Sequence, residues 1–196
     1  EEGMTEDAKL KRSTVERHIS EKSRTERARM CQLTNEVVIC SQRSRSDIGR
    51  AHTDLSSLAR EIILNLQRAE PNRLVEIKIQ DGLAVNGDPL LLRLALENLI
   101  GNAWKYTSKT RNAIIQIGSA AQPDGTRAFF VKDNGAGFDM SAASRLFQPF
   151  QRLHFPSEFP GTGLGLSSVR RIIERHGGKV WAEGKVGVGS TFWFKL

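Results

Sequence analysis

The amino-acid sequence predicts an α+β fold, in which an α/β domain with a mixed, largely antiparallel sheet follows a helical arm over residues 1–50. The arm is predicted because residues 5–46 contain no proline or glycine and are rich in Glu, Lys and Arg, a composition typical of helices. After Gly49, short apolar segments alternate with helical ones, as in an α/β domain. The chain ends in two β-rich segments joined through Gly187 and Gly189, which predicts a hairpin.

The second half of the arm has the apolar spacing of a packing helix. Met30, Leu33, Val37 and Cys40 follow a 3-4-3 spacing, the pattern of a helix that packs against a partner helix. Cys31 lies nine residues before Cys40, on the opposite face of such a helix, so the two thiols cannot form a disulfide within it. Both cysteines are therefore interpreted as reduced thiols of a cytoplasmic protein.

The elements expected after the arm are a series of short strands and three helices. The clearest boundary is Asp88-Pro89, because Asp is a preferred N-cap and Pro is favoured at the first helical position. In chain order we expect a helix over 56–69, strands over 74–79 and 83–85, a long helix from Asp88 to Tyr106, strands over 113–119 and 127–132, a helix ending near His176, and a hairpin of residues 179–184 and 190–196.

Composition and charge indicate a single globular core without a nucleic-acid or membrane role. The chain is 39% hydrophobic and 26% charged, and no stretch approaches the roughly 20 apolar residues that cross a bilayer. The first thirty residues are charged throughout, so no signal peptide is expected. The net charge of +7 is spread over the chain without a basic block, so no nucleic-acid partner is expected.

One helix presents a polar stripe that could bind a charged ligand. Asn98, Asn102 and Lys105 share one face of the helix over 88–106, beside an apolar face. Such a stripe is most often a solvated surface, but Asn is a poor helix former and is chosen twice here. Two amide oxygens on neighbouring turns can bind a hard cation such as Mg²⁺, and the lysine can meet phosphate oxygens.

A glycine run, GTGLGL over residues 161–166, precedes a helix with an apolar stripe. Glycines let the backbone approach an anion, and a helix start offers unpaired N–H groups, so the run predicts a phosphate site. It matches neither the Walker loop nor the dinucleotide-binding GxGxxG arrangement. The alternative is a flexible loop without a ligand.

The stretch FFVKDNGAGF ends an apolar run at Asp133. A calcium loop is excluded because Gly135 and Gly137 occupy the alternate positions where such a loop places its ligands. By itself, the stretch is equally consistent with a β-turn capped by the aspartate and with a binding-site residue.

Four ordered motifs resemble those of one protein family. They resemble the boxes of the ATP-binding domains of sensor histidine kinases, of the phytochrome-like or PAS-linked kind. NLIGNAWKY (98–106) is similar to the asparagine box, DNGAGF (133–138) to the first glycine box, LFQPFQR (146–152) to the phenylalanine box and GTGLGL (161–166) to the second glycine box. The resemblance covers residues 51–196. It implies the Bergerat (GHKL) fold, a two-layer α/β sandwich with helices on one face of the sheet, which topoisomerase, chaperone and mismatch-repair ATPases share. Its mobile lid corresponds to residues 139–162.

The resemblance also implies roles for individual residues. It makes Asn98 and Asn102 the Mg²⁺ and phosphate residues, places Lys105 on phosphate and Tyr106 beside the nucleotide, and makes Asp133 the reader of the adenine amine. Gly135, Gly137 and Phe138 complete the adenine end of the ATP site, and the phosphate end consists of Gly161, Thr162, Gly163, Leu164, Gly165 and Leu166. Phe147 and Phe150 are expected to anchor the lid by packing their rings on the domain.

The implied activity is transfer of the ATP γ-phosphoryl to a histidine, and then to an aspartate on the receiver domain of a response regulator. Hydrolysing relatives carry a glutamate base where this chain has Asn98, which favours transfer over hydrolysis. Residues 29–48 resemble the second helix of the dimerisation hairpin, which implies a homodimer and an upstream sensor domain. The phosphoacceptor is expected outside the chain, because His18 lacks the histidine box.

Two other functions are consistent with the sequence. The chain could be a catalytically silent ATP-binding regulatory module, which the missing histidine box favours, or an ATPase clamp of the topoisomerase or chaperone type, which Asn98 disfavours. The remaining histidines, His52, His154 and His176, are interpreted as surface or packing residues with no metal-site spacing.

Overall fold

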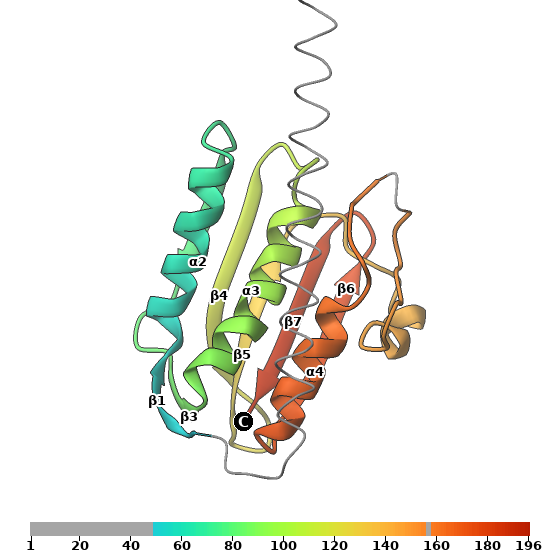
Figure 1. Ribbon diagram of the computed structural model, residues 1–196. Helices are drawn as coiled ribbons and strands as arrows, with labels where there is room; N and C mark the ends of the chain where they lie inside the picture. Colours follow the sequence, from blue (N-terminus) through green and yellow to red (C-terminus); the bar gives the residue numbers. More distant parts are fainter. Residues whose placement is uncertain (1–48, 156–157) are drawn as a thin grey trace, which may run out of the picture. The chain divides into compact units, whose positions relative to one another are not determined.

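The computed structural model describes residues 49–155 and 158–196 (Figure 1). The chain divides into two units, Glu1–Ser44 and Arg45–Leu196, and the first lies outside the described residues. The predictions for the arm's packing helix, its cysteines and His18 therefore also lie outside them.

A five-stranded mixed sheet forms one layer of the domain. Its strand order is β2-β4-β5-β7-β6, in which β2 and β4 pair in parallel and every other neighbouring pair is antiparallel. This confirms the mixed, largely antiparallel sheet. The strands are β2 (Val75–Ile79), β4 (Ala113–Ala121), β5 (Arg127–Asp133), β6 (Lys179–Lys185) and β7 (Gly189–Lys195).

Three helices form the second layer and lie on one face of the sheet, as Figure 1 shows. They are α2 (Leu55–Ala69), α3 (Pro89–Tyr106) and α4 (Gly165–Arg175). The central helix α3 contacts both of its neighbours and is buried over most of its circumference. Its apolar side chains and the inward residues of β4, β5 and β7 make the core, which includes Leu92, Leu96, Leu99, Ile100, Ile115, Val131 and Phe192.

The start of α3 has the predicted cap. The carboxylate of Asp88 accepts hydrogen bonds from the backbone N–H groups of Leu90, at 3.0 Å, and Leu91, at 3.1 Å, and Pro89 occupies the first turn. The N–H groups at a helix start have no partner within the helix, so this cap supplies one. The boundary follows from local chemistry alone.

Two short elements depart from the prediction. Strand β3 (Ala84–Gly87) lies outside the main sheet and pairs antiparallel with β1 (Ala51–Asp54), a strand that the sequence did not predict. A short 3₁₀ helix, η1 (Met140–Arg145), which the sequence did not predict, lies within the lid, and the carboxylate of Asp139 caps it by accepting from the N–H of Ser141 at 2.8 Å.

His176 joins the end of α4 to the start of α3. Its buried imidazole accepts a hydrogen bond through Nε2 from the backbone N–H of Asp88, at 3.0 Å, and its Nδ1 lies 2.7 Å from the carbonyl oxygen of Ile172. Because a backbone N–H only donates and a carbonyl only accepts, the ring must be the neutral tautomer with its proton on Nδ1. The packing role expected for His176 is confirmed, and His52 lies exposed on β1.

No helix among the described residues combines the length and the apolar character that crossing a membrane requires.

Replacing His176 should destabilise the domain. His176→Ala leaves the N–H of Asp88 without its acceptor at a part-buried position, so the free energy of unfolding should fall by roughly 1 to 3 kcal/mol. Denaturant unfolding followed by circular dichroism measures the change. His52→Ala, at an exposed position, is the matched control, and equal stability of the two variants would contradict the role assigned to His176.

Candidate nucleotide site

Helices α3 and α4 meet where Asn98 faces the first residue of α4. The side-chain amide of Asn98 donates through Nδ2 to the carbonyl of Leu94 at 2.9 Å, and its Oδ1 lies so close to Gly165 that a Cβ at that position would overlap it. Only glycine permits this approach between the polar stripe of α3 and the second glycine box. Asn102 follows one turn later on the same face of α3 and is half-buried.

Lys105 continues the stripe toward the other end of the glycine run. Its Nζ lies 4.3 Å from the ring centroid of Tyr106, and a Cβ on Gly161 would lie 3.3 Å from that nitrogen. Burial, together with the nearby guanidinium of Arg152, lowers the pKa of Lys105 to about 8. The tertiary structure therefore brings four predicted residues together along one side of α3, namely Asn98, Lys105, Gly161 and Gly165.

The glycine run has an unsatisfied hydroxyl and an open helix start. Thr162 Oγ1 is buried without a hydrogen-bond partner among the described residues, and no side chain caps the N-terminus of α4 at Leu164. Gly163 has a positive φ of 77° and packs on the backbone of Phe150, and Leu166 is half-buried in the first turn of α4. An orphaned donor and free N–H groups fit phosphate oxygens.

Asp133 ends β5 as a buried acid. Asp133 is 3% exposed, and its Oδ1 accepts a hydrogen bond from the N–H of Gly135 at 2.8 Å. Burial raises the pKa of Asp133 to about 6, although the hydrogen bonds from Gly135 and Ser190 act in the opposite direction. A carboxyl group held in this way is a candidate recognition residue rather than a simple turn cap.

The loop after Asp133 is fastened to the end of α3. The N–H of Ala136 donates to the carbonyl of Tyr106 at 3.1 Å, and a Cβ on Gly135 would lie 2.5 Å from that same oxygen. A Cβ on Gly137, at a φ of 63°, would lie still closer to the carbonyl oxygen of Lys185. The protein's own backbone therefore already requires both glycines, and their expected approach to a base stays a prediction.

Asn134 has a structural role between these residues. Its Oδ1 accepts from the N–H of Ile114 at 2.7 Å, and its Nδ2 donates to the carbonyl of Asn112 at 2.7 Å. The side chain thus ties the loop to the start of β4, which fixes the position of Asp133 next to it.

Of the two predicted lid anchors, one packs on the domain and the other does not. Phe147 packs edge-on against Phe192, with ring centroids 6.5 Å apart, but Phe150 is 73% exposed at a φ of 62°, so its predicted packing is wrong. Phe159, which is 5% exposed, instead packs on Tyr106 with centroids 5.0 Å apart. A proline- and glycine-rich loop lacks the periodicity that could have revealed this anchor.

His154 is a second anchor. Its Nε2 lies 2.9 Å from the carbonyl oxygen of Gly137, and its ring centroid lies 5.2 Å from that of Tyr106 and 5.3 Å from that of Phe159. It thus connects the lid to the first glycine box as well as to α3.

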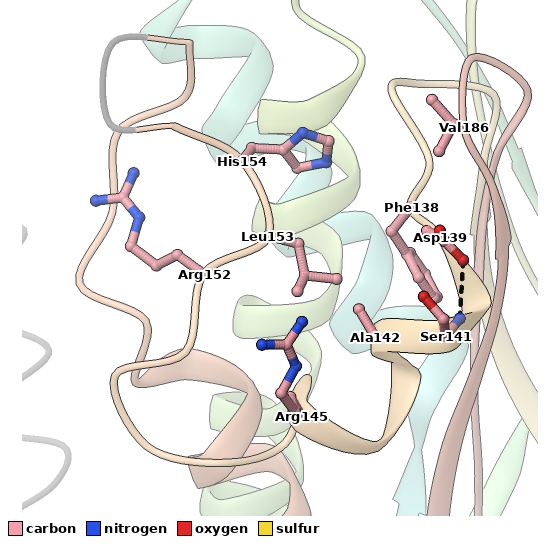
Figure 2. A pocket seen from close by; sticks show the side chains of 9 residues that line it. All are labelled: Phe138, Asp139, Ser141, Ala142, Arg145, Arg152, Leu153, His154 and Val186. Carbon is pink, nitrogen blue, oxygen red and sulfur yellow. Dashed lines mark hydrogen bonds between the residues drawn. The ribbon is translucent and has the colours of Figure 1, made fainter.

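A pocket of about 400 Å³ lies between the two halves of the lid. Figure 2 shows Arg152, Leu153 and His154 on one side of it, opposite the segment from Phe138 to Ala142 and Val186. Of the predicted site residues only Phe138 lines it, and the Phe138 ring packs toward Phe192 with centroids 6.2 Å apart. The polar stripe of α3 and Asp133 are not part of this pocket.

The described residues hold no group of three or more His, Cys, Asp and Glu side chains that could bind a metal ion. A cation in this site would instead be bound by the amide oxygens of Asn98 and Asn102 together with oxygens of the ligand, which suits the hard Mg²⁺ ion.

Removing the charge of Asp133 should stabilise the domain in a pH-dependent way. The pKa of about 6 in the folded protein exceeds the ordinary 3.8, so wild-type stability falls as pH rises from about 4 to 6. Asp133→Asn lacks this loss, so its free energy of unfolding should exceed that of wild type by roughly 1 to 3 kcal/mol above pH 7. Unfolding titrations at several pH values measure the difference.

Asp139→Asn is the matched control for that experiment. Asp139 is exposed, and hydrogen bonds from Ser141 lower the pKa of its carboxyl group, so its contribution is present above pH 4 and is lost as pH falls. A stability gap between wild type and Asp133→Asn that does not change between pH 4 and 8 would contradict the burial of an ionised group.

Comparison with known proteins identifies the family. The family model described as histidine kinase-, DNA gyrase B-, and HSP90-like ATPase matches residues 87–196. Cyanobacterial phytochrome B of Nostoc sp. (strain PCC 7120) is 38% identical over 170 residues, which cover 86% of this chain and 22% of that protein. The circadian input-output histidine kinase CikA of Synechococcus elongatus is 38% identical over 148 residues, 70% of this chain and 19% of that protein. The chain thus spans about a fifth of these relatives.

Solved structures agree with the sequence relatives. Full-length ShkA in complex with AMPPNP superimposes with a TM-score of 0.65 at 27% identity and covers 85% of this chain and 35% of that one. The nucleotide-free catalytic domain of the histidine kinase ThkA gives a TM-score of 0.61 at 27% identity, over 75% of this chain and 94% of that one. The sandwich of five strands and three helices, the polar stripe facing a glycine run and the family model that spans 110 residues lead to one conclusion: this chain belongs to the histidine kinase-, DNA gyrase B-, and HSP90-like ATPase family.

Proposed function

We propose that this chain is the ATP-binding catalytic part of a two-component sensor histidine kinase, which binds Mg-ATP and transfers the γ-phosphoryl group to a histidine. The observation that carries the proposal is the placement of Asn98 and Lys105 against opposite ends of the glycine run, at Gly165 and Gly161. Because α3 runs alongside the run, both elements can contact the same row of phosphates.

Asp133 would read the base at the other end of the site. Its carboxylate lies beside the carbonyl end of α3, since the loop that follows it donates to Tyr106. A carboxylate only accepts hydrogen bonds, so it complements the amine of adenine and not the carbonyl of guanine. Its burial is unfavourable without a ligand and becomes favourable when the amine donates to it.

Lys105 and the glycine run would hold the phosphates. The ammonium group is cationic at neutral pH, the hydroxyl of Thr162 has no hydrogen-bond partner within residues 49–155 and 158–196, and no side chain there caps the N–H groups at the start of α4. These groups together supply positive charge and hydrogen-bond donors to phosphate oxygens.

Asn98 and Asn102 would bind the magnesium ion. Asn98 uses its Nδ2 to donate to Leu94, which leaves Oδ1 as the atom that faces α4. Two amide oxygens with ligand phosphates and water complete the oxygen shell that Mg²⁺ requires. Bound magnesium supplies neutralisation of the charge that develops on the phosphates during transfer.

Transfer is favoured over hydrolysis by the chemistry of Asn98. An amide cannot take a proton from water, so the residue cannot act as a general base. In the proposed reaction a histidine nitrogen forms a bond to the γ-phosphorus, the bond to the bridging oxygen breaks, and ADP leaves. The contribution of this chain is positioning and charge neutralisation, which phosphoryl transfer mainly requires.

The whole-protein context follows from the same proposal. The acceptor histidine lies outside this chain, and a receiver domain of a response regulator accepts the phosphoryl group from it. The similarity to cyanobacterial phytochrome B and CikA supports an upstream sensor domain. A homodimer formed through the arm over residues 1–50 stays a prediction from the sequence.

A phosphotransfer assay tests the proposal. The chain, incubated with labelled ATP, Mg²⁺ and a separately supplied phosphoacceptor helix, should label that helix, and Asn102→Ala should reduce labelling by about 10²-fold or more because the metal ligand is lost. Gln67→Ala, at a surface position of α2, is a control. ATP binding without labelling would instead favour a silent regulatory module, and labelling that survives Asn102→Ala would contradict the site.

The pH dependence of ATP binding tests Lys105. Its pKa of about 8 means that the ammonium loses its proton as pH rises through this value, so ATP affinity should fall between about pH 8 and 10. The unfolded chain binds more protons than the folded one in that range, so the stability of the free protein should rise there instead. Lys105→Arg keeps its charge and should bind ATP with little dependence on pH, and an unchanged profile in that variant would contradict the assignment.

A further inference from the structure

A cluster of side chains at the far side of α3 joins Trp104, in the asparagine box, to Glu70, Arg73 and Thr107, which lie outside all four family motifs. Arg73, in the loop between α2 and β2, donates through Nη2 to the carbonyl of Trp104 and to Thr107 Oγ1, the latter at 2.9 Å. Its guanidinium carbon lies 4.5 Å from the centroid of the Trp104 ring. Glu70 accepts from Trp104 Nε1 at 3.1 Å and lies 3.5 Å from Arg73 Nη1.

These contacts are buried and specific. Trp104 is 3% and Thr107 1% exposed, and the Arg73 side chain is 15% exposed, so these three residues are largely shielded from water, whereas the Glu70 side chain is half exposed. Thr107 Oγ1 also lies 2.7 Å from the carbonyl of Ala103 and thus bridges Arg73 to the last turn of α3. Hydrogen bonds from a charged group are stronger than neutral ones, and a planar guanidinium can stack and donate at the same time.

The cluster completes the C-terminal end of α3. The last carbonyls of a helix have no partner within it, and a cation near them also interacts favourably with the helix dipole. Arg73 supplies both the donors and the charge to the turn that contains Lys105 and Tyr106. That turn is the one whose Tyr106 carbonyl accepts from Ala136, in the loop that carries Asp133.

We infer that Arg73 is a positioning residue for nucleotide binding, which holds the last turn of α3 so that Lys105 meets the phosphates. The inference rests on the proposed function, because it assumes that ATP binds between α3 and the glycine run. Arg73 reaches α3 from the α2 side, whereas Asn98 meets α4, so Arg73 acts through the helix and without contact to ATP.

Direct binding measurements on the full chain test this inference. Arg73→Gln should lower the affinity for ATP by about tenfold, since a small displacement of a binding group can cost up to 10²-fold. The affinity for adenosine, which lacks the phosphates that Lys105 would hold, should fall by at most about twofold. Arg73→Lys keeps the charge but not the fork or the stacking, so its ATP affinity should lie between wild type and Arg73→Gln.

Arg68→Gln is the matched control, because Arg68 is an exposed arginine in the last turn of α2 and should bind ATP like wild type. Thermal melting shows whether each variant is folded at the assay temperature. A general loss of stability would weaken the binding of ATP and of adenosine alike. A selective loss of ATP affinity therefore distinguishes a positioning role of Arg73 from a role in folding. If Arg73→Gln does not fold, Thr107→Val, which removes only the bridging hydroxyl, should show the same selective loss.

Two results would overturn the inference while leaving the proposed function intact. Either ATP affinity is unchanged in a folded Arg73→Gln or Thr107→Val variant, or ATP and adenosine weaken to the same extent. Failure of the wild-type chain to bind ATP at all is a different result, because it contradicts the proposed function itself.

Discussion

The close packing of α3 between fixed neighbours is the constraint on which the rest of the site depends. Asn98, in the middle of α3, approaches Gly165 so closely that no side chain fits there, and the carbonyl of Tyr106 accepts from Ala136 at the C-terminal end of the helix. A helix fixed at these two points can present polar side chains at constant spacing. Protein interiors are close-packed, so small shifts at one contact reach the next.

The electrostatic cost of the site is concentrated in two residues. Burial raises the pKa of Asp133 and lowers that of Lys105, so each residue is less favourable in its charged form than it is in water. A ligand with a donor at one end and phosphates at the other relieves both penalties. Folded proteins retain such local conflicts mainly at functional sites, which is the physical basis for assigning these residues to binding.

The lid and the far side of α3 show how contacts outside the recognised motifs complete the arrangement. His154 and Phe159 fasten the lid to Tyr106, and Arg73 fastens the same end of the helix from the α2 side. With the loop of Ala136, three separate segments thus hold the end of α3. The chain belongs to the histidine kinase-, DNA gyrase B-, and HSP90-like ATPase family, and in the proposed site this end of the helix would face the nucleotide.

The sequence by itself determined the elements whose signals are local. It also identified the four motifs that resemble those of the family. The Asp88-Pro89 start, the amphipathic helices and the final hairpin needed no distant contact, because caps, periodicity and turn glycines act within a few residues. Tertiary structure decided the rest. Strand β1 exists only through its pairing with β3, and Phe159 rather than Phe150 is buried because the path of a loop without periodicity depends on the surface that it meets. Burial also set the charge properties of Asp133 and Lys105, since desolvation comes from residues distant in the chain.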